Sequence, residues 1–486
     1  MPRDDQRAQS TKNGTPVSSW ETVVGLEVHA HLKTRTKMFC RCALEYGAAE
    51  NTHTCPVCLA HPGALPVANG RAIEYTIKLG LALDCEIAES AVFARKNYFY
   101  PDLPKGYQIS QYEAPLCGPG RLVVPTADGD EIVRIVRAHL EEDAAKTVHA
   151  GGATGRSVGA DYSLVDFNRG GTPLLEIVSE PDLRSSEAAL RFLRLLRQTI
   201  VELGVSDAEM EKGTMRADVN VSVRKVGETD YRPRWELKNM NSFSFIGRGI
   251  EAAVREQIAL YERGEAIEQS TYDYDPDTDR LTVHRSKEEA DDYRYFPEPD
   301  LVPVEPPAEL VDRLRAEVPE PPGVRIRLLE QAVGFDVAYA LVTTERDALY
   351  AGLVGHGVEP RLAGNWVMND FAATGDDPAA VDVAGMAVVL KTPGLTRDAL
   401  TDATAASAQP GFSAADYTSR TAVSDASELD PVIDAVLAAN PEQVETYRGG
   451  KEGVLGFLVG QVMKETQGKA DAKTVNALLR EKLKAS

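Results

Sequence analysis

Two long segments of the chain alternate between apolar and polar residues. In residues 21–33, ETVVGLEVHAHLK, apolar side chains fall on one side, and Glu27 and His29 fall on the other. Residues 215–224, MRADVNVSVR, alternate in the same way and place Asp218 among the polar positions. A period of two predicts β-strands that bury one face and leave the other wet or functional.

Other segments predict a mixture of strands and helices. Strand patterns return between residues 120 and 180, in RLVVP, EIVRIVRAHL and PLLEIVSEP. Apolar residues at helical spacing predict a first helix at about 69–83. A second is predicted over LRSSEAALRFLRLLRQTIVELG, where Ser185 or Ser186 can cap the helix and Gly204 can end it. A third is predicted over IGRGIEAAVREQIALYERG. The mixture predicts a single α+β domain.

The composition of the sequence changes along the chain and suggests its domains. Residues 1–18 are polar, lack the apolar core of a secretory signal and predict a loose tail before the domain at 19–297. The Pro-rich stretch FPEPDLVPVEPPAEL marks a boundary, after which residues 298–408 read as helices. A small, polar stretch, TDATAASAQPGFSAADYTSRTAVSD, predicts a linker into a last helical segment, 409–486.

The charge of the chain limits the classes of partner. The 486 residues are 43% hydrophobic and 26% charged, as in an ordinary soluble protein, and no apolar run reaches the roughly 18 residues that span a bilayer. A net charge of −21 argues against an extended surface that coats nucleic acid. Residues 446–486 differ, because eight Lys and Arg there face four acidic residues. This local excess indicates either a nucleic-acid contact or a solvated helical face.

Four of the six cysteines lie close together. Cys40 and Cys42 form one pair, and Cys55 and Cys58 form a second pair twelve residues later. Two close pairs joined by a short loop can arrange four thiolates tetrahedrally around Zn²⁺. Such a closed site has no open position, so we expect a structural role. The alternative is a group of four buried thiols without a metal.

A second group of residues is acidic and lies on several predicted strands. A carboxylate within a strand needs a partner, because burying an unpaired charge is costly. Carboxylates together with one histidine suit Mg²⁺, which often bridges nucleotide phosphates. The alternative for each acidic residue is an ordinary salt bridge or a position in solvent. The candidates for a Mg²⁺ site are Glu27, His29, Glu141, Glu142, Glu176 and Asp218.

Basic residues beside aromatic residues suggest contacts with phosphates and bases. The segment ARKNYFYPDLPKGYQISQY holds Arg95, Lys96, Lys105 and several tyrosines, although a packed Tyr-rich loop explains it equally well. The segment Gly151–Ser157, GGATGRS, looks slightly like a phosphate-binding loop but lacks its lysine. The sequence shows no serine elbow and no convincing Cys–His nucleophile pair, so we expect that this chain does not release ammonia from glutamine.

Several long blocks of the sequence resemble one family in the same order. They include VVGLEVHAHLKTRTKMFC, CPVCLAHPGALPVAN, RKNYFYPDLPKGYQISQY, YSLVDFNRGGTPLLEIVSEPD and GFLVGQVMK, and the resemblance runs from about residue 20 to 486. The family is GatB, the B subunits of bacterial aspartyl/glutamyl-tRNA(Asn/Gln) amidotransferases. The resemblance implies an α+β fold with an N-terminal cradle domain on an antiparallel sheet, an all-α helical domain and a small helical tail similar to YqeY.

The resemblance also implies a reaction. A protein of this family uses ATP and Mg²⁺ to phosphorylate the side-chain carboxylate of misacylated Glu-tRNA(Gln) or Asp-tRNA(Asn) in the cytoplasm. Ammonia from an amidase partner, GatA, then displaces phosphate, and a small third protein, GatC, completes the heterotrimer.

By the same resemblance, particular residues acquire expected roles. The metal and kinase site matches Glu27, His29, Glu142, Glu176 and Asp218, with Glu141 as a neighbour. Lys105 and Arg216 are weaker candidates for phosphate contact. The four cysteines match a zinc site that occurs in part of the family. The tail would bind tRNA, with Lys451, Lys464 and Lys469 as candidate contacts.

Two other functions compete with this one. A noncatalytic, zinc-containing RNA-binding scaffold is the first, but a scaffold has no need of converging acidic residues. A free-standing amidase is the second, and the missing nucleophile disfavours it. Whether Glu-tRNA(Gln), Asp-tRNA(Asn) or both is the substrate does not follow from the sequence.

Overall fold

The computed structural model describes residues 19–151, 160–238, 240–286, 293–421, 426–466 and 469–485. The chain divides into two compact units, Met1–Gly323 and Val324–Ser486. The expected tail, residues 1–18, and most of the Gly151–Ser157 segment lie outside the described residues. The expected domain boundaries at residues 298 and 409 stay predictions.

The first unit is built on an eight-stranded sheet with the order β12-β11-β10-β9-β1-β8-β5-β4. Neighbouring strands are antiparallel except for β10 and β11, which are parallel. The α+β class and the antiparallel-rich sheet expected from the sequence are therefore confirmed. The strands are β1 (Trp20–His31), β4 (Gly120–Thr126), β5 (Gly129–Glu142), β8 (Pro173–Ser179), β9 (Met215–Lys225), β10 (Trp235–Lys238), β11 (Ser270–Asp275) and β12 (Arg280–Ser286).

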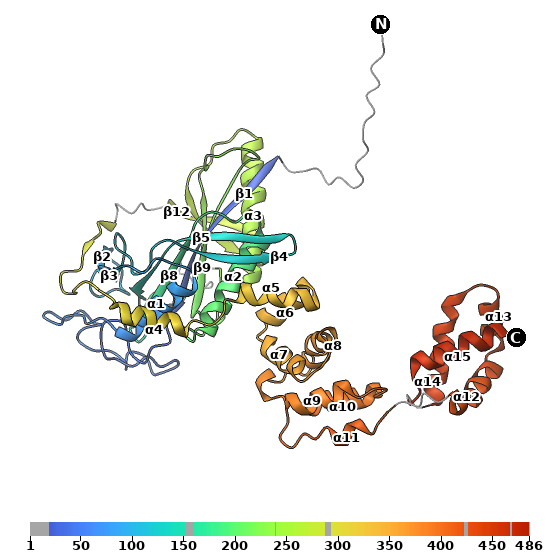
Figure 1. The fold of residues 1–486 in the computed structure, drawn as a ribbon. Coiled ribbons are helices and arrows are strands. Elements are labelled where there is room, and N and C mark those ends of the chain that lie inside the picture. Colours follow the sequence, from blue (N-terminus) through green and yellow to red (C-terminus); the bar gives the residue numbers. More distant parts are fainter. Residues whose placement is uncertain are drawn as a thin grey trace, which may run out of the picture. The chain divides into compact units, whose positions relative to one another are not determined.

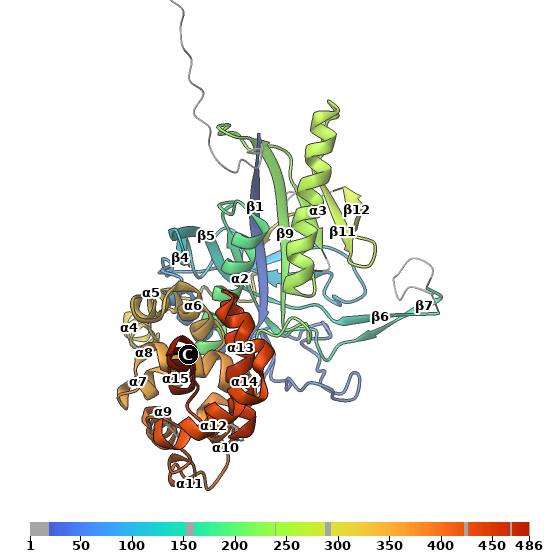
Figure 2. The ribbon, with the colours of Figure 1, turned by 90° about the vertical axis from the view of Figure 1, so that its right-hand side faces the viewer.

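Two long helices lie beside the sheet, α2 (Ser186–Glu202) and α3 (Phe243–Glu262) (Figures 1 and 2). The side chain of Ser185 accepts a hydrogen bond from Ala188 N, so Ser185 is the cap of α2 and Ser186 is its first residue. Helix α3 packs on β9, and Gln257 of α3 donates to the Val221 carbonyl. The apolar residues at every second position of β1 and β9 are fully buried, which leaves the alternate positions for polar side chains.

Smaller elements complete the first unit. A three-stranded sheet joins β2 (Ala94–Asn97), β3 (Tyr107–Ser110) and β13 (Phe296–Pro297). Arg95 on β2 holds the chain just after β13 through two hydrogen bonds to the buried carboxylate of Glu298, at 2.8 and 2.7 Å. Helix α4 (Ala308–Glu317) packs on α1 (Gly70–Ala82). Strands β6 (Lys146–Ala150) and β7 (Tyr162–Asp166) form a separate hairpin that projects from the unit (Figure 2).

The second unit is helical and contains two separate hydrophobic clusters. The first cluster surrounds the buried Trp366 and Phe371, and the second surrounds Ile433, Leu458 and Leu479. The first group of helices is α5 (Pro322–Val333), which begins just before the division between the units, α6 (Phe335–Thr343), α7 (Asp347–Gly355), α8 (Pro360–Asn365), η2 (Trp366–Phe371), η3 (Pro378–Ala380), α9 (Val383–Lys391), α10 (Arg397–Ala406) and α11 (Ala415–Thr418). The second group is α12 (Ala426–Ala439), α13 (Pro441–Arg448), η4 (Glu452–Val454), α14 (Leu455–Glu465) and α15 (Ala472–Ala485). Among the described residues, no helix has the length and hydrophobicity needed to cross a membrane.

Candidate functional site

The register of the central strands places four polar side chains in one row across the sheet. Arg216 of β9 lies opposite His29 of β1, and His29 lies opposite Glu176 of β8. Glu176 in turn lies opposite His139 of β5. Side chains of directly opposed residues on one face lie about 5 Å apart at Cβ, so this row brings residues from four strands into contact.

Three of the expected residues converge closely enough to hold a metal ion. One ligand atom each from His29, Glu141 and Glu176 lies within 4.8 Å of the others. His29 Nε2 is 3.3 Å from Glu176 Oε2 and 3.9 Å from Glu141 Oε1, and the three side chains are at most 12% exposed. Two carboxylates and an imidazole suit a divalent cation, and the carboxylate oxygens suit Mg²⁺ in particular. The residues present therefore fit the expected ion.

The protonation of this cluster reflects burial and mutual repulsion. Burial, followed by the charge of Glu176, raises the pKa of Glu141 to about 7. Burial opposes the charged form of Glu176 as well, but the charges of His139 and His29 and the hydrogen bond from His29 outweigh it and hold its pKa well below its ordinary value. Burial opposes the charged form of His29, yet the hydrogen bond to Glu176 and its charge raise the pKa of His29. Near neutral pH the cluster is thus one ionised carboxylate, Glu176, and one partly protonated carboxyl, Glu141, beside His29.

These residues lie in a cavity of about 810 Å³. Glu27 and Asp218, which are directly opposite each other on β1 and β9, line the same cavity. Asn220 donates to Glu27 Oε1 at 3.0 Å, and Lys238 Nζ lies 2.7 Å from Asp218 Oδ2. Among the described residues, the lining contains six carboxylates and six Lys or Arg side chains, so a bound divalent cation would give these residues a net positive charge suited to a polyphosphate.

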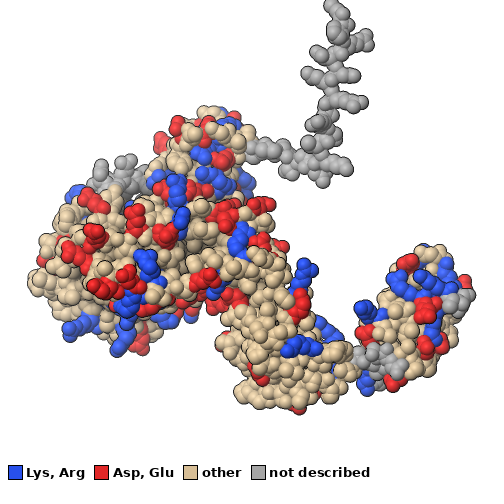
Figure 3. Space-filling model, viewed as in Figure 1, with Lys and Arg blue, Asp and Glu red and all other residues tan. Residues whose placement is uncertain are grey.

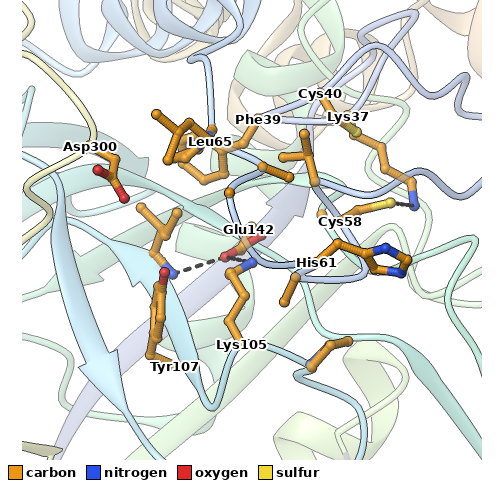
Figure 4. Close-up of a pocket in the computed structure, with 18 residues that line it drawn as sticks. Lys37, Phe39, Cys40, Cys58, His61, Leu65, Lys105, Tyr107, Glu142 and Asp300 are labelled. Atoms are coloured by element: carbon orange, nitrogen blue, oxygen red, sulfur yellow. Dashed lines mark hydrogen bonds and ion pairs between the residues drawn. The ribbon is translucent and has the colours of Figure 1, made fainter.

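Glu142 does not join this cluster, which corrects the expected grouping. Successive side chains of a strand point to opposite faces, so Glu141 faces the large cavity and Glu142 faces away from it. Glu142 Oε1 lies 2.6 Å from Lys105 Nζ and accepts a hydrogen bond from Ile109 N at 3.0 Å (Figure 4). Lys105, expected to contact phosphate, therefore lies with Glu142 in a second cavity of about 300 Å³. Arg216, the other candidate for phosphate contact, does line the large cavity.

The four clustered cysteines come together as their spacing predicts. One sulfur atom from each of the four lies within 4.8 Å of the others, a group that could hold a metal ion. Cys55 N donates to Cys58 Sγ at 3.2 Å, and Lys37 Nζ lies 3.7 Å from the same sulfur. A hydrogen bond from Cys40 is the main cause that lowers the pKa of Cys58 to about 4. Figure 4 shows Cys40, Cys58 and Lys37 at one side of the smaller cavity.

Several residues of the large cavity were not among the candidates predicted from the sequence, although a pattern for some of them was present. In the segment RAHLEED, every second residue from Arg137 lines the large cavity. These residues include His139, Glu141 and Asp143, whereas Glu142 is out of phase and does not line this cavity. Arg137 Nε donates to His139 Nδ1 at 3.3 Å, and His139 Nε2 lies 3.7 Å from Glu176 Oε2. Lys96 belongs to the segment in which the sequence sets basic residues beside aromatic ones. It reaches the cavity from β2, and its Nζ lies 4.8 Å from the Tyr293 ring centroid.

The expected tRNA contacts of the tail lie far along the chain from this cavity. Lys451, Lys464 and Lys469 are all exposed to solvent, whereas Lys482 is held by Asp434 at 2.7 Å. Figure 3 shows that basic side chains are mixed with acidic ones over the visible face of this part of the chain. A lysine must be exposed to bind a polyanion such as tRNA, but exposure alone does not identify a lysine as a tRNA contact.

Comparisons with known proteins cover nearly the whole chain. A family model described as the GatB/GatE catalytic domain matches residues 22–312, and one described as a GatB domain, of the YqeY type, matches residues 413–483. The B subunit of the aspartyl/glutamyl-tRNA(Asn/Gln) amidotransferase of Anaeromyxobacter sp. strain K is 46% identical, over 96% of this chain and 99% of the relative. Proteins of the same name from Moorella thermoacetica and Geobacter sulfurreducens are 44% and 43% identical, each over 96% of this chain and 100% of the relative.

The raised pKa of Glu141 predicts a pH-dependent stability in metal-free protein. A carboxyl whose pKa is about 7 when folded, but near its ordinary value when unfolded, contributes stability below the unfolded pKa and loses it as the pH rises through 7. The side chain of the Glu141→Gln variant cannot ionise. Its free energy of unfolding should therefore rise relative to that of the wild type by on the order of 2 kcal/mol between about pH 5 and pH 8. Urea unfolding across this range, with a chelator present, measures the difference.

A matched control is Glu131→Gln, which changes an exposed carboxylate on the same strand outside the cavity. This variant should leave the pH dependence of the wild type in place. A stability difference between Glu141→Gln and wild type that stays constant with pH would contradict the assignment.

Proposed function

The chain belongs to the GatB/GatE family, and from that premise we propose that it is the B subunit of a glutamine-dependent tRNA amidotransferase. Its reaction would be the ATP-dependent amidation of misacylated Glu-tRNA(Gln), Asp-tRNA(Asn) or both. We further propose that it works in the cytoplasm as one part of a heterotrimer with an amidase of the GatA type and a small protein of the GatC type. The observation that carries the proposal is the convergence of His29, Glu141 and Glu176 in the 810 Å³ cavity.

The chemistry of amidation explains why such a cavity is needed. A carboxylate is a poor acyl donor because its oxygen is a bad leaving group. Attack of a carboxylate oxygen on the terminal phosphorus of ATP forms a new O–P bond, and the bond from that phosphorus to the bridging oxygen breaks as ADP leaves. Ammonia then attacks the acyl carbon, phosphate leaves with the bonding electrons, and the new amide nitrogen loses a proton.

The residues of the large cavity supply what the first step requires. Phosphoryl transfer depends mainly on positioning and on neutralising charge. His29, Glu141 and Glu176 would hold Mg²⁺, which when bound supplies that neutralisation. Glu27 and Asp218 line the same cavity and would orient groups around this centre. Glu142 and Lys105, which pair with each other in the smaller cavity, are not assigned to this step.

A scaffold without catalysis accounts poorly for this geometry. Three nearly buried ionisable groups at the centre of a sheet carry a desolvation cost that a purely structural core avoids. The competing amidase function needs a nucleophile beside a base. The cavity lining contains no cysteine, and its serine, Ser110, donates to Glu141 at 3.3 Å.

The first prediction from this function concerns Glu176. Glu176→Gln removes a charged ligand and should lower tRNA-dependent ATP cleavage by about 100-fold or more. Hydrolysis of glutamine by the assembled complex should survive, because its nucleophile would lie in another chain. Release of ADP and of glutamate, measured separately on the same complex, distinguishes the two activities.

Glu180→Gln, which changes the carboxylate just beyond the end of β8, is the matched control and should keep both activities. Full amidation by the Glu176→Gln complex would show that the site is assigned wrongly.

The second prediction concerns the four cysteines, which we propose bind one structural Zn²⁺ per chain. Replacing Cys42 with Ser should remove most of the zinc and lower the midpoint of thermal unfolding, because binding of a structural metal contributes directly to folding. Elemental analysis and thermal unfolding of the purified chain measure these effects. Cys85→Ala changes a cysteine outside the cluster and should retain the zinc.

Four thiols that react freely with an alkylating reagent in native wild-type protein, together with an absence of zinc, would rule this site out.

The third prediction concerns the tail, residues 409–486, which we propose binds tRNA. Exchanging Lys451, Lys464 and Lys469 for Gln should raise the KM for aminoacyl-tRNA. It should also flatten the dependence of affinity on salt, whose log–log slope is about −0.9 per neutralised phosphate of a duplex. Truncation near residue 408 should have a larger effect of the same kind while ATP binding persists.

Lys482→Gln is the control, because Asp430 and Asp434 already neutralise this lysine at 3.1 and 2.7 Å. An unchanged tRNA affinity and salt slope in the truncated protein would exclude this role for the tail.

A further inference from the structure

A lysine is fully buried beside the four clustered cysteines. Lys37 has no exposed surface. Its Nζ donates to the Phe167 carbonyl at 2.8 Å and lies 3.7 Å from Cys58 Sγ (Figure 4). Among the described residues, no carboxylate forms an ion pair with this ammonium group. Its polar partners are therefore one neutral oxygen and one sulfur.

A buried ammonium group needs a negative charge beside it. Burying an unpaired charge is costly, and a neutral carbonyl accepts a hydrogen bond without offsetting the charge. A protonated thiol is only a weak acceptor. Zinc binding ionises its cysteine ligands, so four thiolates around one Zn²⁺ carry two more negative charges than positive ones. An occupied cysteine site would thus supply the charge that Lys37 requires.

Lys37 is also the basic residue best placed to offset the excess charge of such a site. Within the described part of the chain, no other lysine or arginine donates to one of the four sulfur atoms. His53, which lies between the two cysteine pairs in the sequence, is turned to other groups. Its Nδ1 is 3.1 Å from the Ala43 carbonyl, and its Nε2 is 3.7 Å from Glu45 Oε2.

The position of the ammonium group is fixed by the backbone on two sides. Met38 N donates to the Gly171 carbonyl at 2.7 Å, and Phe167 N donates to Asn51 Oδ1 at 2.7 Å, so the cysteine loop and the turn 167–171 hold each other. Gly171 has φ +85°, and a Cβ there would lie 3.4 Å from Lys37 Cδ. The lysine thus runs between the loop and a turn that leaves it little room to move.

A cation beside a thiolate ligand stabilises the metal-bound form of the site, and partners just outside the ligands commonly tune metal affinity. We propose that Lys37 is the counter-ion of the zinc centre, so that tight binding of the metal and burial of the ammonium group depend on each other. This inference rests on the proposed zinc site and adds to it a residue that is not a ligand. Lys37 acts on the metal through Cys58.

The first test removes the charge but keeps the length of the side chain. In the full chain, Lys37→Met should weaken zinc binding by about 10- to 100-fold. Competition with a chelator that changes colour on binding zinc measures the affinity. Lys33→Met is the matched control, because Lys33 is exposed and pairs with Asp207 at 2.6 Å, and this variant should bind zinc like the wild type.

A spectroscopic measurement separates the effect of the charge from an effect on packing. Co²⁺ in place of zinc gives an absorption band in which an electron moves from sulfur to the metal. Removing the ammonium group raises the energy of the sulfur electrons, so this band in Lys37→Met should shift to longer wavelength. Loss of packing alone would leave the band in place, and Lys33→Met should keep the wild-type spectrum.

A third measurement uses the wild type and needs no variant to fold. An amine-reactive acylating reagent should leave Lys37 unmodified in zinc-loaded protein. After a chelator has removed the zinc, Lys37 should react about tenfold faster or more, because the loop can then open locally. Mass spectrometry of peptides locates the modification, and the exposed Lys33 should react equally in both samples.

The outcomes separate this inference from the two proposals that precede it. Equal zinc affinity and equal cobalt spectra in Lys37→Met and wild type overturn the counter-ion, while loss of zinc in Cys42→Ser upholds the metal site. A Lys37 that stays protected after zinc removal also overturns it. Wild type that binds no zinc overturns both the site and its counter-ion. None of these results bears on amidation, which the Glu176→Gln complex tests.

Discussion

The centre of the sheet holds a carboxylate that cannot be buried alone. Glu176 lies on β8 between β1 and β5, and its side chain is only 12% exposed. An isolated carboxylate in such a place would be strongly destabilising, so its neighbours must compensate it. His29 on one side and His139 on the other approach the same oxygen, at 3.3 and 3.7 Å. The arrangement of the whole cavity follows from this requirement.

The same requirement explains the order of charges along the cavity. Glu141 approaches the cluster from β5, and burial together with the nearby charge of Glu176 raises its pKa to about 7. Beyond it, Asp143 is balanced by arginines, and Asp218 is balanced by Lys238. Asp143 and Asp218 therefore each face a fully charged basic side chain, whereas Glu141 and Glu176 lie together beside His29, which is the position where a divalent cation is most favoured.

Strand β5 separates two different environments. Glu141 lies on the side of the large polar cavity, while Glu142 lies with Lys105 in the smaller cavity that the cysteine loop also lines. Because the two residues are adjacent, a change in the position of this strand would affect both cavities at once. A metal ion held by the cysteines would fix the loop that lines the smaller cavity together with Glu142 and Lys105.

The sequence by itself determined the local features of this protein. The period of two in β1 and β9, the helical spacing of α1 to α3 and a serine cap at the start of α2 depend on neighbours in the chain. The structure contains each of them, with Ser185 and not Ser186 as the cap. The paired spacing of the cysteines likewise predicted their convergence, because short loops limit where the sulfurs can lie. Tertiary structure alone decided which carboxylates meet. Strand order and register join β9, β1, β8 and β5. These pairings between distant segments bring Glu141 and not Glu142 to the cluster, add His139, and place Lys96 and Lys105 in different cavities. No local pattern encodes these strand pairings. The alternation of residues along one strand indicates which side chains share a face, but it does not indicate which strand lies beside it.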